Sequence, residues 1–375
     1  DAPNHDDRFL NRARNGARRK GLKVAGLLHR IRFGLSATAL VVTLGAIAVW
    51  AAGCGGDDGG AGNVSPTVTE SAGPGEEDQL SAVVVTPELS TGPNRFAVGV
   101  IDEAEGIPLL DAEVSLRFFK LLSESEGQLR FEADAEFVGF DTYTIDDGTG
   151  ETKLGGATGV YKADVDFDET GAWGVEITGN KGDRIIGPFT LPIEVLPPEQ
   201  VLGVADPAPR TRQQIASDVA DIREIESMQP PDPFHDTTIA DAVTSGKPSV
   251  IIFGTPAFCE TMTCGPVMQT VMLPLYEEFK DEATFIHVEP YLLEELRAGR
   301  AICAVPAFNA EFARQGLGEG GECPKASEQE LQAAGESWNL TTEPILFVVD
   351  AAGNIAGRFE GVISRQEVAD LLATV

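Results

Sequence analysis

Residues 246–266 read GKPSVIIFGTPAFCETMTCGP, an apolar run followed by a loop that holds two cysteines. The run SVIIFG has the length of a strand, and its continuous apolar residues after Ser249 are typical of a strand covered on both faces. Over residues 265–281 the apolar side chains recur at helical spacing, and Pro274 is expected to kink that helix. The sequence therefore predicts a strand and a helix joined by a loop that carries Cys259 and Cys264.

Further elements are expected on both sides of this stretch. They are a helix at 239–246, strands at 283–288, 345–350 and 355–361, and a helix that closes the chain. The last two strands flank the turn AAGN and predict a hairpin. Helices and strands in this alternating order indicate an α/β domain with a mixed sheet, which we assign to residues 234–375.

The place of the two cysteines in this order gives them a chemical role. The helix after them opens with Gly265-Pro266, where a proline loses no needed hydrogen bond. The positive end of a helix lowers the pKa of a nearby thiol and so raises its thiolate fraction. A four-residue loop readily brings two Cα atoms to the ~5.5–6 Å of a disulfide. We expect Cys259 and Cys264 to form a redox-active disulfide, with a permanently oxidised structural disulfide as the alternative.

Three stretches carry a resemblance to a known family: GKPSVIIFGTPAFC, the CGP at 264–266, and EPILFVVDAAGNIAGRFEG at 343–361. They resemble the thioredoxin-like domain of membrane-tethered bacterial proteins of the TlpA-like thiol-disulfide oxidoreductase class. The resemblance implies thiol-disulfide exchange on other envelope proteins, with Pro344 in cis beside the cysteines. The family's C-x-x-C is here C-x-x-x-x-C. The position of its nucleophile corresponds to Cys259, whereas placement at the helix start favours Cys264, and the sequence leaves this choice open.

Two other functions compete with exchange. Sco-type copper chaperones share the fold and use two cysteines with a distant histidine. The corresponding copper ligands here are Cys259, Cys264 and His287, joined by Met262 in the loop, because soft sulfur ligands suit Cu(I). The third possibility is a catalytically inert interaction module. Under the exchange hypothesis we expect no cofactor.

A second cysteine pair flanks an insertion between a strand and a helix. Cys303 and Cys323 enclose the residues AVPAFNAEFARQGLGEGGE. Outside the cytoplasm such a pair is usually oxidised, so we expect a structural disulfide. The alternative is that these two cysteines resolve disulfides for the Cys259/Cys264 pair.

The region before the α/β domain has a different pattern. Across residues 81–197, about seven short apolar or alternating runs are separated by turn-rich segments, which predicts an all-β sandwich. The stretch GVYKADVDFDETGAWGVEI at 159–177 is similar to the late strands of immunoglobulin-like domains of bacterial envelope proteins. Residues 198–233 are rich in proline and indicate a linker with one short helical patch.

The N-terminal region indicates attachment to a membrane. Residues 33–52 carry no charge and are long enough to span a bilayer as a helix. Because residues 1–32 are basic, the positive-inside rule places them in the cytoplasm and residues 55–375 outside, anchored to the cytoplasmic membrane. Small residues before Cys54 resemble a lipobox, so the 33–54 segment is either a lipoprotein signal with Cys54 lipidated or an uncleaved anchor. Residues 55–80 predict a flexible tether.

The charge of the chain excludes one class of partner. The net charge of −31 divides into +6 on residues 1–32 and −37 on the remainder. An acidic body repels phosphate, so we expect no binding to nucleic acid. A hydrophobic content of 42% excludes wholesale disorder.

Overall fold

The computed structural model describes residues 80–123, 126–259 and 261–375. The predicted segment 33–54, Cys54 and nearly all of the predicted tether lie outside the described residues. Within the described part, no helix is both long enough and apolar enough to cross a bilayer.

Strands alone make up the first part of the described chain. They are β1 Leu80–Val84, β2 Leu89–Ser90, β3 Gly92–Asp102, β4 Ile107–Pro108, β5 Glu113–Ser123, β6 Glu126–Ile145, β7 Thr152–Phe167, β8 Gly171–Lys181 and β9 Arg184–Leu196. Hydrogen bonding joins them in the order β1-β3-β7-β6-β5-β8-β9-β2, and β4 pairs with β3. The alternating runs of the sequence therefore do form strands, and several are longer than the runs indicated.

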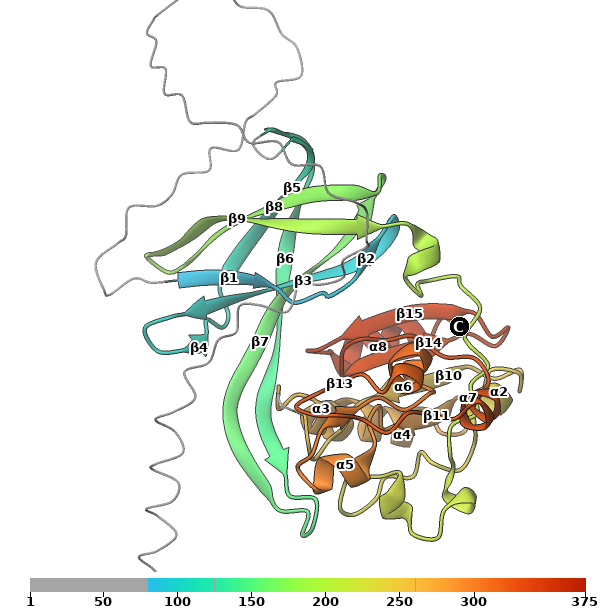
Figure 1. Cartoon of the computed structure of the whole chain (residues 1–375). Coiled ribbons are helices and arrows are strands. Elements are labelled where there is room, and N and C mark those ends of the chain that lie inside the picture. The colour runs from blue at the N-terminus through green and yellow to red at the C-terminus, as the bar shows by residue number, and fades with distance from the viewer. Residues whose placement is uncertain (1–79, 124–125, 260) are drawn as a thin grey trace, which may run out of the picture. The chain divides into compact units, whose positions relative to one another are not determined.

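The long strand β6 makes this sheet fold over its own core. Its first half pairs with β5, where Phe131 faces Phe118, and its second half pairs with β7, where Phe137 faces Tyr161. The two halves of the sheet enclose one apolar core that includes the fully buried Trp173. Beyond this core β6 and β7 continue as a long curved hairpin (Figure 1). The immunoglobulin-like assignment is finer than this arrangement and stays a prediction.

The second part of the chain alternates helices and strands. Its elements are α2 Ile239–Ala242, β10 Ser249–Phe253, α3 Cys264–Val267, η4 Met268–Met272, α4 Leu273–Phe279, β11 Thr284–Val288, α5 Leu293–Arg297, β12 Ile302–Cys303, α6 Ala310–Gln315, β13 Gly318–Glu319, α7 Glu328–Ala334, β14 Ile345–Val349, β15 Ile355–Glu360 and α8 Arg365–Leu372. The central sheet has the order β11-β10-β14-β15. β10 and β11 are parallel, and β14 is antiparallel to both β10 and β15. A βαβ unit followed by a β-hairpin and a helix is the thioredoxin-like fold.

Both faces of this sheet are covered. On one face Ile252 and Leu346 pack with the helical run that starts at α3 and with α8. On the other face Ile251 and Phe347 pack with α2 and with Trp338. Coverage on both faces explains why β14 has no polar position and β10 has none after its first residue, Ser249.

The kink expected at Pro274 takes the form of a change in helix type. Between α3 and α4 the chain forms the π-helical segment η4, and Pro274 follows in the first turn of α4. A proline lacks the N–H that an α-helix requires, and a π-turn is a common way to absorb that loss.

The proline-rich segment after β9 packs along the thioredoxin-like part. It forms three 3₁₀ turns, η1 Pro198–Gln200, η2 Ala216–Asp218 and η3 Ile222–Glu224, in place of the helical patch predicted there. Its backbone bonds to β15 through Ala205 N–H, which donates to the carbonyl of Ile355. Glu226 and Ser227 are fully buried.

Candidate functional site

The paired cysteines lie where β10 meets the helical run. The chain leaves β10 at Phe253, passes through a short turn and reaches Cys259, and Cys264 is the first residue of α3. The two are disulfide-bonded, with their Cα atoms 6.0 Å apart. Cys264 is fully buried, whereas Cys259 retains 7% of its surface.

The hydrogen bonds of the loop favour Cys259 as the thiolate. The backbone N–H of Cys264, at the start of the helix, donates to Cys259 Sγ at 3.4 Å. The hydroxyl of Thr261 lies 3.1 Å from the same sulfur. Donors at these positions stabilise negative charge on Cys259. In this wider loop the N–H at the helix start therefore donates to Cys259. Placement in the sequence had instead favoured Cys264 as the thiolate.

Pro344 and Glu343 complete the surroundings of the sulfurs. The Glu343–Pro344 peptide bond is cis. A Cβ placed on Gly254 would lie 3.7 Å from Pro344 Cβ and 3.8 Å from Cys264 Sγ, so Gly254 fits between them. One Glu343 carboxylate oxygen and the two sulfurs all lie within 4.8 Å of one another.

The carboxyl of Glu343 is tuned by its surroundings. Burial raises the pKa of Glu343 to about 7. Its Oε2 atom is buried and has no hydrogen-bond partner among the described residues. A carboxyl with this pKa beside a thiol can accept or return a proton near neutral pH.

The β6–β7 hairpin contacts the start of the helix. The hydroxyl of Tyr143 donates to the carbonyl of Gly265 at 3.0 Å. Ile145 belongs to the same apolar core as the helix. On the other strand, a Cβ on Gly155 would lie 3.0 Å from the Sδ and Cε atoms of Met262. The sequence analysis gave no sign of this contact between the strands and the loop.

The residues predicted for copper do not form one group in this structure. Met262 adopts a left-handed backbone conformation, with φ of 56°, and its thioether packs on β7. His287 directs its Nδ1 to Asp232 and its Nε2 to the carbonyl of Gly254. The group around the sulfurs has Glu343 as its third member.

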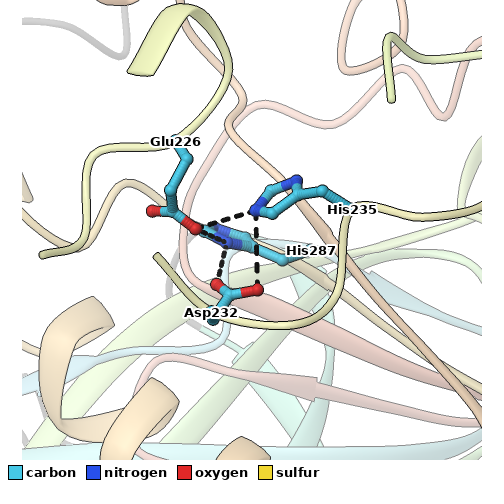
Figure 2. Close-up of side chains that lie close together, drawn as sticks. All are labelled: Glu226, Asp232, His235 and His287. Atoms are coloured by element: carbon cyan, nitrogen blue, oxygen red, sulfur yellow. Dashed lines mark hydrogen bonds and ion pairs between the residues drawn. The ribbon is translucent and has the colours of Figure 1, made fainter. Parts of the chain in front are cut away.

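His287 instead belongs to a buried polar cluster. Its members are Glu226, Asp232, His235 and His287, and Figure 2 shows the four side chains converging. His287 Nδ1 lies 2.7 Å from Asp232 Oδ2 and 3.4 Å from Glu226 Oε2. His235 Nε2 lies 2.7 Å from Glu226 Oε2 and 3.5 Å from Asp232 Oδ1.

Mutual interaction sets the protonation of this cluster. Burial opposes the charge of His287, but Asp232 and Glu226 outweigh it and hold the pKa of His287 well above its usual value. The same balance raises the pKa of His235. Burial also opposes ionisation of Asp232, and the two imidazoles nevertheless hold its pKa well below the usual range. The raised pKa values of both histidines therefore favour imidazolium groups beside Asp232.

A cavity of about 1050 Å³ adjoins this cluster. His235, His287, Glu289 and Arg297 are among its lining residues. Glu289 accepts a hydrogen bond from the backbone of Ser227, and burial raises the pKa of Glu289 to about 8.

Sequence reasoning missed three of the four residues in this cluster. Glu226, Asp232 and His235 fall in or beside the segment interpreted as a linker, and only His287 was singled out. The signal that could have found them is local: an aspartate and a histidine three residues apart in PPDPFHD, in a chain with four histidines.

The second cysteine pair is separate from the first. Cys303 and Cys323 form a disulfide with a Cα–Cα distance of 5.5 Å. It closes the region where β12 pairs with β13, with Cys303 opposite Gly318. The structural role of this bond stays a prediction.

Comparisons with known proteins add little to this description. No family model matches the sequence, and no curated protein matches it. Among solved structures, a thiol:disulfide interchange protein of the thioredoxin family from Chlorobium tepidum TLS matches with 18% identity and a TM-score of 0.24. The match covers 45% of this chain and 95% of that one. A likeness this distant carries no argument about activity, and the fold assignment rests on the order and direction of the strands.

Proposed function

We propose that this protein is a thiol-disulfide oxidoreductase that uses Cys259 and Cys264. The observation that carries the proposal is the disulfide at the junction of β10 and α3, with Cys259 Sγ accepting from the helix start. A disulfide at the C-terminal end of a central strand, beside a helix start, supports exchange with a partner disulfide.

The proposed reaction balances as two successive exchanges. In the reduced protein the Cys259 thiolate attacks one sulfur of a partner disulfide, and the other partner sulfur leaves as a thiolate. Cys264 then loses its proton and attacks Cys259 Sγ, which releases the second partner sulfur. The partner gains two electrons and the protein is left with its Cys259–Cys264 disulfide. The reverse sequence oxidises a partner dithiol.

Glu343 is the group we propose for the proton step. Its carboxylate lies within 4.8 Å of both sulfurs, and its pKa of about 7 matches proton exchange with a thiol at neutral pH. The acid that the family often places in the strand before the motif is absent, because Ile252 occupies that position. Glu343, next to Pro344, is the carboxyl that lies near the sulfurs in this structure.

We further propose that the reaction takes place outside the cytoplasm, on envelope proteins, with the chain anchored through residues 33–54. The uncharged run with its basic flank supports the anchor. The Cys303–Cys323 disulfide supports an oxidising compartment. The strands of β1–β9 then serve as an immunoglobulin-like spacer or docking part.

Trapping of a mixed disulfide tests the proposed function. The full chain, reduced, is mixed with a disulfide-containing peptide. Wild type should turn over, Cys264→Ser should accumulate a covalent adduct through Cys259, and Cys259→Ser should form none. If the wild type neither turns over nor exchanges, the oxidoreductase hypothesis is wrong and the inert interaction module is favoured. Retention of one Cu(I) per chain without exchange would favour the copper carrier.

A further inference from the structure

We propose that Glu226, Asp232, His235 and His287 form a binding site for a divalent transition-metal ion of the zinc class. Their four ligand atoms lie within 4.8 Å of one another, and all four residues are buried. The site is distinct from the cysteine pair, and the proposal holds whether or not the protein catalyses exchange.

The donor set identifies the class of metal. Two imidazole nitrogens and two carboxylate oxygens are the ligands of four-coordinate zinc, with bonds of about 2.0–2.2 Å. Tetrahedral bonds of that length separate the ligand atoms by about 3.3 Å. The contact from His287 Nδ1 to Glu226 Oε2, at 3.4 Å, already has this spacing. The other two contacts, at 2.7 Å, need side-chain adjustments of about half an ångström.

The atoms behind the ligands are already held in place. His287 Nε2 lies 2.8 Å from the carbonyl of Gly254, which leaves Nδ1 to face the cluster. Asp232 Oδ1 accepts from the backbone of Phe234 at 2.9 Å, and Glu226 Oε1 accepts from the backbone of Met228. Metal sites characteristically fix their ligands through such hydrogen bonds.

Charge also favours a divalent ion at this position. Two carboxylates buried together need two positive charges, because isolated charges are costly inside a protein. One divalent cation satisfies that need and leaves both imidazoles neutral. On binding, the ion would also lengthen the 2.7 Å carboxylate–imidazole contacts to the distance between ligand atoms of a tetrahedral site.

The cavity of about 1050 Å³ provides the path by which an ion reaches the site. His235 and His287 both line it, and so does Glu289, whose Oε2 has no hydrogen-bond partner in the described part of the chain. An entry path together with ligands and their supporting contacts is what a working metal site requires.

Titration of the oxidised full chain with Co²⁺ and with Zn²⁺ tests the proposal. With both disulfides closed, four of the five cysteines are excluded as thiol ligands, and Cys54 is replaced by alanine so that it cannot bind the ion. We expect one ion per chain, and the Co²⁺ form should show the visible absorption of a tetrahedral site. X-ray absorption of the Zn²⁺ form should show nitrogen and oxygen ligands with imidazole scattering and no sulfur.

Matched variants assign the site to these residues. His235→Gln should bind Co²⁺ roughly 100-fold more weakly or not at all, since removal of a ligand costs at least as much as loss of a supporting contact. The double variant Cys259→Ser/Cys264→Ser should bind as the wild type does. Circular dichroism checks that each variant is folded. If His235→Gln proves unfolded, the X-ray absorption of the wild type decides alone.

Three results would overturn the metal site. They are the absence of stoichiometric binding by the oxidised wild type, a sulfur ligand in its X-ray absorption, and unchanged binding by folded His235→Gln. The first of these would leave the cluster as a buried ion-pair network.

Discussion

At the scale of single residues, the sulfur of Cys259 is set apart by two donors from its own loop. The helix-start N–H of Cys264 and the hydroxyl of Thr261 both approach it, whereas Cys264 Sγ lies against Gly254. With a four-residue spacer, the positive end of the helix thus acts on Cys259. From the sequence alone this electrostatic effect was assigned to Cys264.

Thr261→Val should raise the pKa of the Cys259 thiol. The substitution removes one hydrogen bond to the thiolate, a loss of about 1 kcal/mol, which corresponds to somewhat less than one pH unit. Alkylation rates of the reduced protein measured against pH give the value. Thr270→Val is the matched control, because its hydroxyl donates to the carbonyl of Pro266, away from the sulfurs. A Cys259 pKa equal in all three proteins would remove Thr261 from the account.

Glu343→Gln should change how stability depends on pH. In the folded protein the carboxyl has a pKa of about 7, above the ~4.3 of an unfolded chain, so its ionisation costs the folded state free energy. Wild type should therefore lose stability relative to Glu343→Gln as pH rises from about 4.5 to 7, by on the order of 2–3 kcal/mol, and the difference should then level off.

Urea unfolding of both proteins in the oxidised state, across pH 4.5 to 8, measures that difference. Glu322→Gln serves as the control, since Glu322 is exposed and its removal should leave the pH profile of the wild type intact. A constant difference between wild type and Glu343→Gln would show that the carboxyl ionises normally.

At the scale of elements, the β6–β7 hairpin and the cysteine loop are one structural unit. Tyr143 and Ile145 from β6 contact the start of the helix, and Gly155 of β7 lies against Met262. A Cβ at position 265 would lie 3.2 Å from side-chain atoms of both Tyr143 and Ile145, so these side chains would have to shift by a few tenths of an ångström to admit one. From these contacts we expect the hairpin to restrict access to the disulfide.

Tyr143→Phe should loosen this contact. It removes the hydrogen bond to Gly265, and we expect a loss of about 1 kcal/mol in unfolding free energy with faster alkylation of reduced Cys259. Tyr276→Phe is the control, because that ring packs on Phe234 and Phe285 and its hydroxyl has no partner recorded within the described residues. Equal alkylation rates in both variants and wild type would mean that the hairpin does not shield the sulfur.

The Cys303–Cys323 disulfide closes the insertion between β12 and α7. A bond that spans 20 residues should stabilise the protein by about 3 kcal/mol in the loop-entropy description. The double variant Cys303→Ser/Cys323→Ser should lose about that much in unfolding free energy and retain turnover. Peptide mapping without reductant checks the pairing. A reproducible Cys259–Cys303 or Cys264–Cys323 peptide would instead favour a resolving role.

At the scale of the whole molecule, the parts that follow a local period could be predicted from sequence. Strand β10 and the helical run after it were recognised because apolar residues at period 3.6, or in an unbroken run, reflect burial on known faces. The strands β3, β5 and β7 were recognised by alternation for the same reason. The order of elements within residues 234–375 predicted an α/β domain with a mixed sheet, and the thioredoxin-like fold was implied by the resemblance of the motifs at 246–266 and 343–361.

What the sequence did not reveal depends on contacts between distant segments. Glu226 meets His287 only after the 60 residues between them have folded, and no period marks either residue. Tyr143 reaches Gly265 across 122 residues. The segment 198–233 was interpreted as a linker because of its dense prolines, yet Glu226 and Asp232 in it are buried and pair with His235 and His287.

We propose that Cys259 and Cys264 cycle between dithiol and disulfide. A redox titration of the full chain tests this cycling. The protein is equilibrated in thiol buffers of graded potential, and each cysteine is quantified by differential alkylation and mass spectrometry. We expect a two-electron transition of the Cys259–Cys264 pair between about −300 and −100 mV, the range of thiol-disulfide oxidoreductases. Cys303–Cys323 should stay oxidised over the same range. A Cys259–Cys264 bond as resistant as Cys303–Cys323 throughout that range would contradict it.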